Sequence, residues 1–279
     1  MTEKTYLENP YLREFKGKVI KKEKVNDMYH IYLNRTVFYP NTMHSELKDK
    51  GTINGIEVLD VFEKGEHIVH VLKENISSKD VNILIDWNNR FDYMQQHTGQ
   101  HLLSASIHKL YDKETINFRL DESYAYIEIN IEKIKGEDIS RIEKFANSII
   151  HSNFKIKTYE LSKESQSEIE SGTRVAEIDN IYITPCESIH CSNSGEVGII
   201  KILDYEEIEN KGIVIKFVCG NRALRDYEKK NECINSVSKL LSLEERDIYK
   251  GVELLLDKKE KLEEQVRILR EEIGMYNRK

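Results

Sequence analysis

The chain has 279 residues, of which 39% are hydrophobic and 33% charged, and its mean hydropathy of −0.58 indicates a well-solvated, soluble protein of one large or two modest domains. No apolar run approaches the ~20 residues that span a bilayer, so we expect no membrane segment and a cytoplasmic location. The formal net charge of −7 argues against indiscriminate nucleic-acid binding, although a local basic patch could still dock one structured RNA.

Residues 1–88 are predicted to form a small β-barrel domain. Short segments of alternating or β-branched residues are separated there by glycine, asparagine or charged turns, a spacing typical of small barrels. The predicted strands are residues 17–20, 29–33, 36–40, 55–62 and 67–72. His67 and His70 are three positions apart on one strand and would point to opposite faces. We therefore interpret them as structural residues and not as joint ligands.

A polar break at residues 86–89 carries helix-capping side chains, and a segment with two histidines follows it. His97 and His101 lie in an apolar-periodic run, and on a helix this spacing stacks them on one face with about 5–6 Å between their Cβ atoms. Two imidazoles so placed can reach one metal ion. The intervening residues include no carboxylate base, unlike those of His-Glu-x-x-His metalloproteases. Among them, Thr98 and Gln100 are our candidate catalytic residues.

The remainder of residues 89–228 mixes strands and helices, which predicts an α+β domain. The predicted strands are residues 124–131, 155–161 and 181–185, followed by a hairpin of residues 195–202 and 212–219. The predicted helices are residues 136–152 and 163–171.

A second pair of candidate ligands, Cys186 and His190, again stands four positions apart. The four cysteines do not resemble a disulfide framework for a chain of this size, so a ligand or a buried thiol is the better interpretation. Both pairs would occur together by chance in about one chain in thirty. Because a thiolate with imidazoles is a zinc ligand set, we predict a zinc site of His97, His101, Cys186 and His190. Three protein ligands with an open position and four protein ligands both remain compatible with the sequence.

Residues 229–279 are predicted to be a helical coiled-coil segment, within a region that is helical from Asn221 onward. Apolar residues fall there on alternating steps of three and four, which is a heptad pattern. The a positions are Val252, Lys259, Val266 and Ile273, and the d positions are Leu255, Leu262 and Leu269. β-branched residues at a with leucine at d favour a parallel dimer, so we expect a homodimer. The alternative is a solvated helix that packs on its own domain.

Several motifs occur in an order that resembles one known family. They are Phe38-Tyr-Pro, Lys50-Gly-Thr-Ile, Asp86-Trp, Met94-Gln-Gln-His-Thr-Gly-Gln-His-Leu-Leu-Ser-Ala, Cys186-x-x-x-His, Ser194-Gly-Glu-Val-Gly and Gly220-Asn-Arg-Ala-Leu. Together they resemble the alanyl-tRNA editing proteins of the AlaX type, freestanding relatives of the alanyl-tRNA synthetase editing domain. The likeness extends from about Tyr11 to Tyr227.

This resemblance implies a zinc-dependent deacylase that hydrolyses Ser-tRNA(Ala), and often Gly-tRNA(Ala), with the four predicted ligands holding the zinc. It also implies tRNA as the partner and makes a phosphate contact plausible for Arg222 and Arg225. With Lys229 and Lys230 these form the best basic cluster of the sequence, although a surface salt bridge is an equally good interpretation of either arginine.

The chain departs from the family pattern in three places. A glycine-rich loop is replaced by residues 41–46, the ligand loop at 187–189 reads Glu-Ser-Ile where the family has Gly-Gly-Thr, and residues 117–121 read Asn-Phe-Arg-Leu-Asp. These changes motivate two alternatives. One is a zinc-stabilised RNA-binding or partner-binding module without activity, and the other is a deacylase for another aminoacyl-tRNA.

Overall fold

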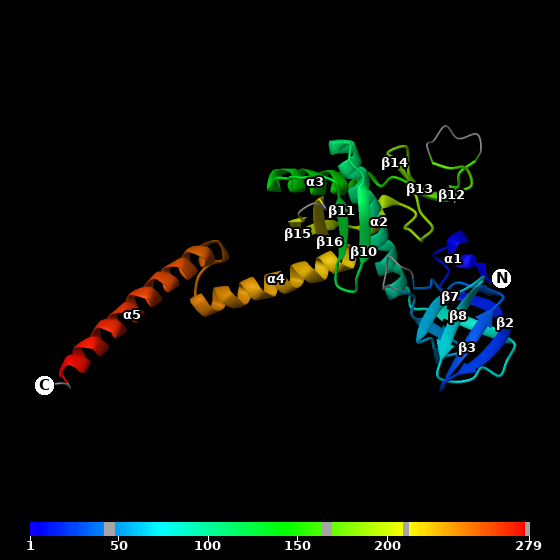
Figure 1. Cartoon of the computed structure of the whole chain (residues 1–279), viewed down its shortest axis with the longest axis horizontal. Helices are drawn as coiled ribbons and strands as arrows, with labels where there is room; N and C mark the ends of the chain where they lie inside the picture. The colour runs from blue at the N-terminus through cyan, green and yellow to red at the C-terminus, as the bar shows by residue number, and fades with distance from the viewer. Residues whose placement is uncertain (42–47, 163–168, 209–211, 277–279) are drawn as a thin grey trace. The chain divides into compact units, whose positions relative to one another are not determined.

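The computed structural model divides the chain into two compact units, Met1–Ala223 and Leu224–Lys279 (Figure 1). It describes residues 1–41, 48–162, 169–208 and 212–276. Within these ranges no helix combines the length and the apolar character that crossing a bilayer requires. The finer division at 88/89 and 228/229 stays our proposal.

The N-terminal part of the first unit is a curled antiparallel sheet of seven strands in the order β6-β5-β9-β2-β3-β8-β7. Its strands are β2 (Glu14–Val25), β3 (Met28–Leu33), β5 (Gly51–Ile53), β6 (Ile56–Glu57), β7 (Asp60–Lys64), β8 (His67–Leu72) and β9 (Asp80–Ile85). The long strand β2 pairs with β9 through its first half and with β3 through its second, so the sheet bends around one apolar core. A parallel pair, β1 (Glu3–Lys4) and β4 (Arg35–Thr36), and the short helix α1 (Thr5–Glu8) accompany it. Among the described residues no pairing joins β6 to β7, so a closed barrel stays a prediction.

Two predicted strands of this region differ in the structure. Strand 36–40 ends at Thr36, because the next amides bond to side chains: Phe38 N–H donates to Thr36 Oγ1 and Tyr39 N–H to Asp49 Oδ2. Strand 55–62 is interrupted after Glu57, and β7 begins at Asp60.

Helix α2 (Trp87–Tyr111) is the central element of the first unit. Asp86 caps it, since its carboxylate accepts the backbone N–H groups of Asn88 and Asn89, as the polar break predicted. Every residue from 93 to 107 is buried, so the helix is enclosed on all sides. Gly99 permits this, because a Cβ there would lie 2.2 Å from Cys219 Sγ.

Two further sheets and a helix complete the first unit around α2 (Figure 1). One sheet has the order β10-β11-β16-β15 and the other β12-β13-β14, both antiparallel. The elements are β10 (Thr115–Leu120), β11 (Ala125–Ile129), α3 (Gly136–Ser152), β12 (Ile156–Glu160), β13 (Arg174–Ile178), β14 (Tyr182–Pro185), β15 (Ile200–Ile208) and β16 (Gly212–Cys219). The predicted mixed α+β architecture is confirmed.

Two predictions in this region need comment. The first strand of the predicted hairpin begins only at Ile200, because residues Ser194–Val197 form the 3₁₀ helix η1, in which Glu196 caps the backbone N–H of Asn193. Most of the predicted helix 163–171 falls outside the described residues, and its remainder, 169–171, is not helical.

Two long helices occupy the C-terminal region, where one continuous helical stretch was predicted. Helix α4 (Gly220–Leu241) begins in the first unit and continues into the second. Helix α4 ends there because Ser242 adopts a left-handed conformation (φ 54°). The 3₁₀ helix η2 (Glu245–Asp247) then leads into α5 (Ile248–Tyr276).

His70 is a structural residue, as the sequence predicted, and its burial gives a pH dependence of stability. Its Nε2 lies 2.8 Å from Thr36 Oγ1 and its Nδ1 3.1 Å from the Ile31 carbonyl, and burial lowers its pKa to about 4. Below pH 6.5 this histidine becomes protonated in the unfolded chain but stays neutral in the folded chain. Stability should therefore fall as the pH drops from 6.5 to 4.

We predict that His70 accounts for about 3 kcal/mol of this loss by pH 4. The measurement is the free energy of unfolding in urea across this range for the wild-type protein and for His70→Gln. The wild-type protein should lose about 3 kcal/mol more of its free energy of unfolding over this range than His70→Gln does. Equal losses in the two proteins would show that His70 titrates normally in the folded protein.

Candidate metal centre

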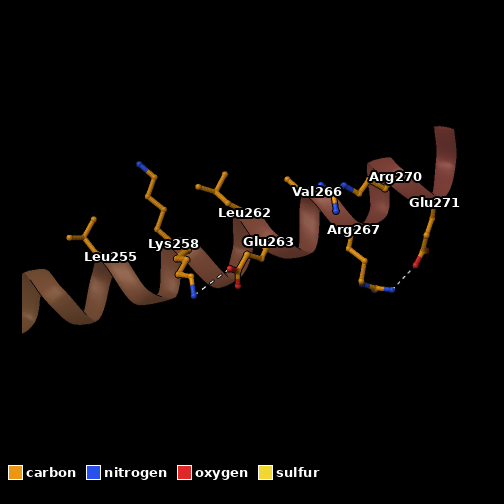
Figure 2. Close-up of a pocket in the computed structure, with 9 residues that line it drawn as sticks. Leu255, Lys258, Leu262, Glu263, Val266, Arg267, Arg270 and Glu271 are labelled. Atoms are coloured by element: carbon orange, nitrogen blue, oxygen red, sulfur yellow. Dashed lines mark hydrogen bonds and ion pairs between the residues drawn. The ribbon is translucent and has the colours of Figure 1, made fainter. Parts of the chain in front are cut away.

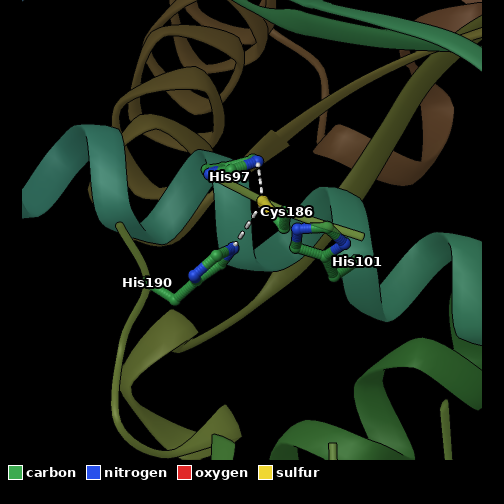
Figure 3. Close-up of side chains that lie close together, drawn as sticks. All are labelled: His97, His101, Cys186 and His190. Carbon is green, nitrogen blue, oxygen red and sulfur yellow. Dashed lines mark hydrogen bonds between the residues drawn. The ribbon is translucent and has the colours of Figure 1, made fainter. Parts of the chain in front are cut away.

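The structure brings together the two pairs of predicted ligands (Figure 3). His97 and His101 project from one face of α2, and Cys186 and His190 face them from the segment that follows β14. One ligand atom from each of the four side chains lies within 4.8 Å of the other three. This group could hold a metal ion.

The distances inside this cluster fit a single ion. Cys186 Sγ lies 3.7 Å from His97 Nε2 and 3.4 Å from His190 Nε2. Tetrahedral bonds of about 2.0–2.3 Å place neighbouring ligand atoms about 3.3–3.8 Å apart. His101 buries both ring nitrogens without a protein hydrogen-bond partner, and His190 buries an unpartnered Nδ1. Buried polar atoms without partners are costly, and a coordinated cation would satisfy one nitrogen of each imidazole.

The protonation states of the cluster are compatible with metal coordination. Burial and then the neighbouring imidazoles hold the pKa values of His101 and His190 well below the usual range, so both rings are neutral and free to coordinate. Burial also raises the pKa of the Cys186 thiol to about 11. A thiolate at this position therefore requires a positive charge beside it.

A pocket of about 630 Å³ opens onto one side of the cluster, where His97 and Cys186 form part of its wall. Most of the rest of the wall comes from residues far apart in the sequence: Lys4, Tyr6, Tyr39, Pro40, Asn41, Glu63, Tyr93, Phe118, Thr173, Arg174, Pro185, Glu187 and Ser188. The Phe118 ring stacks on His97, with centroids 5.5 Å apart and planes 19° apart. A substrate in this pocket would lie against His97 and Cys186, two of the four candidate ligands.

A buried ion pair fixes one wall of the pocket to α2. Arg90, which is fully buried, donates from Nε to Asp49 Oδ1 at 2.8 Å and from Nη2 to Asp49 Oδ2. The same carboxylate accepts the Tyr39 backbone N–H at 2.6 Å, and the guanidinium also donates to the carbonyls of Pro10 and Val37. The Phe-Tyr-Pro segment is thereby held against the first turn of α2.

The altered ligand loop is accommodated without loss of the ligands. Ile189 is buried in the main core, and its carbonyl accepts a hydrogen bond from His97 Nδ1 at 3.3 Å, which orients that ring. The Ser188 hydroxyl bonds to two tyrosines, and Glu187 is exposed at the pocket wall. Residues 42–46 of the loop that differs from the family pattern lie outside the described residues, whereas Asn41 lies within them.

The candidate catalytic residues Thr98 and Gln100 lie beside the cluster but not among the pocket-lining residues. Thr98 Oγ1 accepts the backbone N–H of Cys191 at 3.0 Å, and Gln100 Nε2 donates to Ser104 Oγ at 2.9 Å. These contacts support the ligand loop and the helix. A catalytic role for either residue stays a prediction.

The predicted tRNA-binding residues are placed differently from one another. Arg222 is buried, and its guanidinium bonds to both Asp92 carboxylate oxygens and to the Asp121 carbonyl. The other three, Arg225, Lys229 and Lys230, are exposed on α4, where Lys230 pairs with Asp226 at 2.6 Å.

Several pocket residues escaped the sequence analysis, among them Tyr6, Tyr93 and Arg174. Tyr93 carries a usable signal, because it lies four positions before His97 and thus on the same helix face. Tyr6 and Arg174 carry none, since only the tertiary fold brings them to the pocket.

Comparison with known proteins decides the family. The alanyl-tRNA editing protein AlaX-L of Pyrococcus horikoshii is 32% identical to this chain over all of its length and 70% of the relative's own. The chain belongs to the alanyl-tRNA editing proteins. The resemblance drawn from its motifs is therefore confirmed, and the family consists of aminoacyl-tRNA deacylases.

Two further relatives agree with this assignment. The alanyl-tRNA editing protein Aarsd1 of Mus musculus is 29% identical over 84% of this chain and 60% of its own length. The alanine--tRNA ligase of Ignicoccus hospitalis is 27% identical over 91% of this chain and 30% of the ligase. No family model matches the sequence.

Proposed function

We propose that this editing protein is a zinc-dependent deacylase that hydrolyses Ser-tRNA(Ala), and also Gly-tRNA(Ala), in trans in the cytoplasm. The observation that supports it best is the four-residue cluster, two members of which, His97 and Cys186, line a pocket large enough for an aminoacyl group. Family membership supplies the reaction class, and the donor set supplies the choice of metal, because one thiolate with three imidazoles suits zinc.

His97, His101, Cys186 and His190 would hold the zinc, which when bound supplies a Lewis acid for the ester carbonyl or an activated water. The protein's own contribution is orientation. The Ile189 carbonyl fixes the His97 ring, and the Phe118 ring covers one of its faces. Tyr39 and Tyr93 enclose the side of the pocket next to His97, which limits the water that reaches the reacting ester.

One observation favours a second candidate, a deacylase for a different aminoacyl-tRNA. Glu187 and Ser188 place side chains in the pocket wall at positions where the family pattern has glycines. The extra atoms alter the space beside the metal cluster, and the amino acid accepted can change with it. A binding module that has lost catalysis is the remaining alternative.

The proposal predicts rapid loss of the ester from Ser-tRNA(Ala) and slower loss from correctly charged Ala-tRNA(Ala). The measurement is release of labelled amino acid from a panel of charged tRNAs that also includes Gly-tRNA(Ala) and Ser-tRNA(Thr). Preferential hydrolysis of another member would support the second candidate. If zinc-loaded protein accelerates the hydrolysis of none of these esters, the proposal that it is an enzyme is rejected.

The zinc assignment predicts about one zinc per chain in the purified protein and a large loss of it in Cys186→Ala. Cys233→Ala is the matched control, because Cys233 is exposed on α4. Metal analysis should show full occupancy in the control and a melting temperature lowered only in Cys186→Ala. Undiminished zinc in Cys186→Ala would remove this thiol from the ligand set.

For tRNA docking we propose the exposed cations of α4, which are Arg225, Lys229 and Lys230. Arg222 was predicted to join them, but its buried pairing with Asp92 suits a structural role better. The negative net charge requires such a local patch, since the chain as a whole repels RNA.

We also propose that α5 forms a homodimeric coiled coil. Leu255, Leu262 and Val266 lie along one side of the helix, flanked by charged residues such as Lys258 and Arg270 (Figure 2). All three apolar side chains are 46–51% exposed within the single chain. An apolar stripe of this length is normally covered by a partner helix.

The dimer proposal predicts twice the chain mass in light scattering of the full-length protein at micromolar concentration. A variant ending at Ser242 and the full-length Leu262→Glu should both be monomeric, because the first lacks α5 and the second places a charge at a d position. The exposed change Glu260→Gln serves as the control. A monomeric wild-type protein would contradict the dimer.

A further inference from the structure

Three buried hydroxyl groups meet in the pocket wall next to the metal cluster. The Ser188 hydroxyl lies 2.8 Å from the hydroxyl of Tyr39 and 2.8 Å from that of Tyr93. The Tyr93 hydroxyl donates to that of Tyr39 at 3.2 Å. The three side chains come from three separate segments, and all three line the pocket.

The hydrogen-bond count of this ring decides what it can offer a ligand. Each hydroxyl has one proton and two acceptor lone pairs. Because Tyr93 donates to Tyr39, the three contacts are satisfied when Tyr39 donates to Ser188 and Ser188 donates to Tyr93. All three protons are then used inside the ring, while the oxygens of Ser188 and Tyr93 each retain a lone pair. The ring is an acceptor site.

Aromatic rings surround the hydroxyl ring, and the same pocket wall carries the cations Lys4 and Arg174 as well as two carboxylates. The rings of Tyr39 and Tyr93 lie with centroids 5.0 Å apart, and the Tyr6 ring meets that of Tyr39 edge-on at 5.4 Å. Aromatic faces attract ammonium groups. Of the carboxylates at the wall, Glu63 pairs with Lys4, and Glu187 stands next to Ser188.

The hydroxyl ring adjoins the candidate metal centre. Tyr93 is one helical turn before His97, and their rings are 5.8 Å apart. Ser188 stands between Cys186 and His190 in the ligand loop. The α-nitrogen of an aminoacyl ester is two bonds from the carbonyl carbon that reacts. A carbonyl at the metal cluster would therefore leave the nitrogen within reach of this ring.

We propose that the hydroxyl ring of Tyr39, Tyr93 and Ser188 binds the α-ammonium group of the substrate, which confines the enzyme to esters with a free amino group. This inference rests on the proposed deacylase function and deepens it. N-acylated aminoacyl-tRNAs, including peptidyl-tRNA, would be rejected, because acylation removes the charge and leaves one N–H donor on the nitrogen. Ser188 thereby takes part in substrate binding, at a position where the family pattern has glycine.

The test is binding of two probes to the full-length, zinc-loaded protein. One is an acceptor-stem RNA of tRNA(Ala) that ends in serine through a non-hydrolysable 3′-amide, and the other is the same RNA with its serine N-acetylated. Wild-type protein should bind the free-amine probe at least ~100-fold more tightly, because a site built for a donor leaves its acceptors unpaired with the wrong ligand.

Removing one hydroxyl should weaken this preference by about tenfold in Tyr93→Phe and in Ser188→Ala. Tyr182→Phe is the matched control, because its hydroxyl donates to Glu114 outside this pocket, and its preference should equal that of the wild type. Zinc content and circular dichroism of each variant separate loss of the ring from loss of the fold. A merely structural ring would change the affinity for both probes and leave their ratio unaltered.

Equal affinity of the wild-type protein for the two probes, absence of binding, or a ratio unchanged in both ring variants would overturn the inference. Hydrolysis of Ser-tRNA(Ala), measured on the same preparation, keeps the two proposals apart. Hydrolysis without amine preference rejects the ring alone. Amine preference that depends on the ring, without hydrolysis, supports the ring and rejects the deacylase.

Discussion

The buried ion pair between Arg90 and Asp49 is the contact on which the arrangement of the pocket depends. Burying two charges is costly, and removing one partner of such a pair typically destabilises a protein by about 3–5 kcal/mol. The cost is offset here because the guanidinium also bonds to two carbonyls and the carboxylate to the Tyr39 N–H. One interaction thus joins the curled sheet, the Phe-Tyr-Pro segment and α2.

Helix α2 passes this constraint on to the candidate metal centre. The Gln96 side chain pairs with both backbone groups of Cys219, so the end of β16 is fixed to the same helix turn that carries His97. Thr98 accepts the N–H of Cys191, next to His190. The candidate ligands are therefore positioned by hydrogen bonds that the buried polar side chains next to His97 make. The hydroxyl ring depends on the same elements, because Tyr93 lies on α2 and Ser188 lies in the ligand loop.

Local chemistry made much of this site predictable from the sequence. The cap at Asp86 and the 3.6-residue period predicted α2, and ligand spacing predicted the two pairs that the structure brings together. The hydroxyl ring was not predictable, because Ser188 is 149 positions from Tyr39 and 95 from Tyr93. Likewise Arg222 reads as a surface cation in sequence, and only its contact with Asp92, 130 positions away, shows that it is buried. Contacts that depend on the tertiary fold leave no mark on local periodicity.

We propose that one zinc ion is held by a thiolate and imidazoles contributed by two distant segments. X-ray absorption at the zinc edge of the purified full-length protein tests it most directly. We expect one sulfur scatterer at about 2.3 Å together with imidazole nitrogens at about 2.0–2.1 Å. A zinc shell of oxygen and nitrogen only, or a shell with two or more sulfurs, would contradict it.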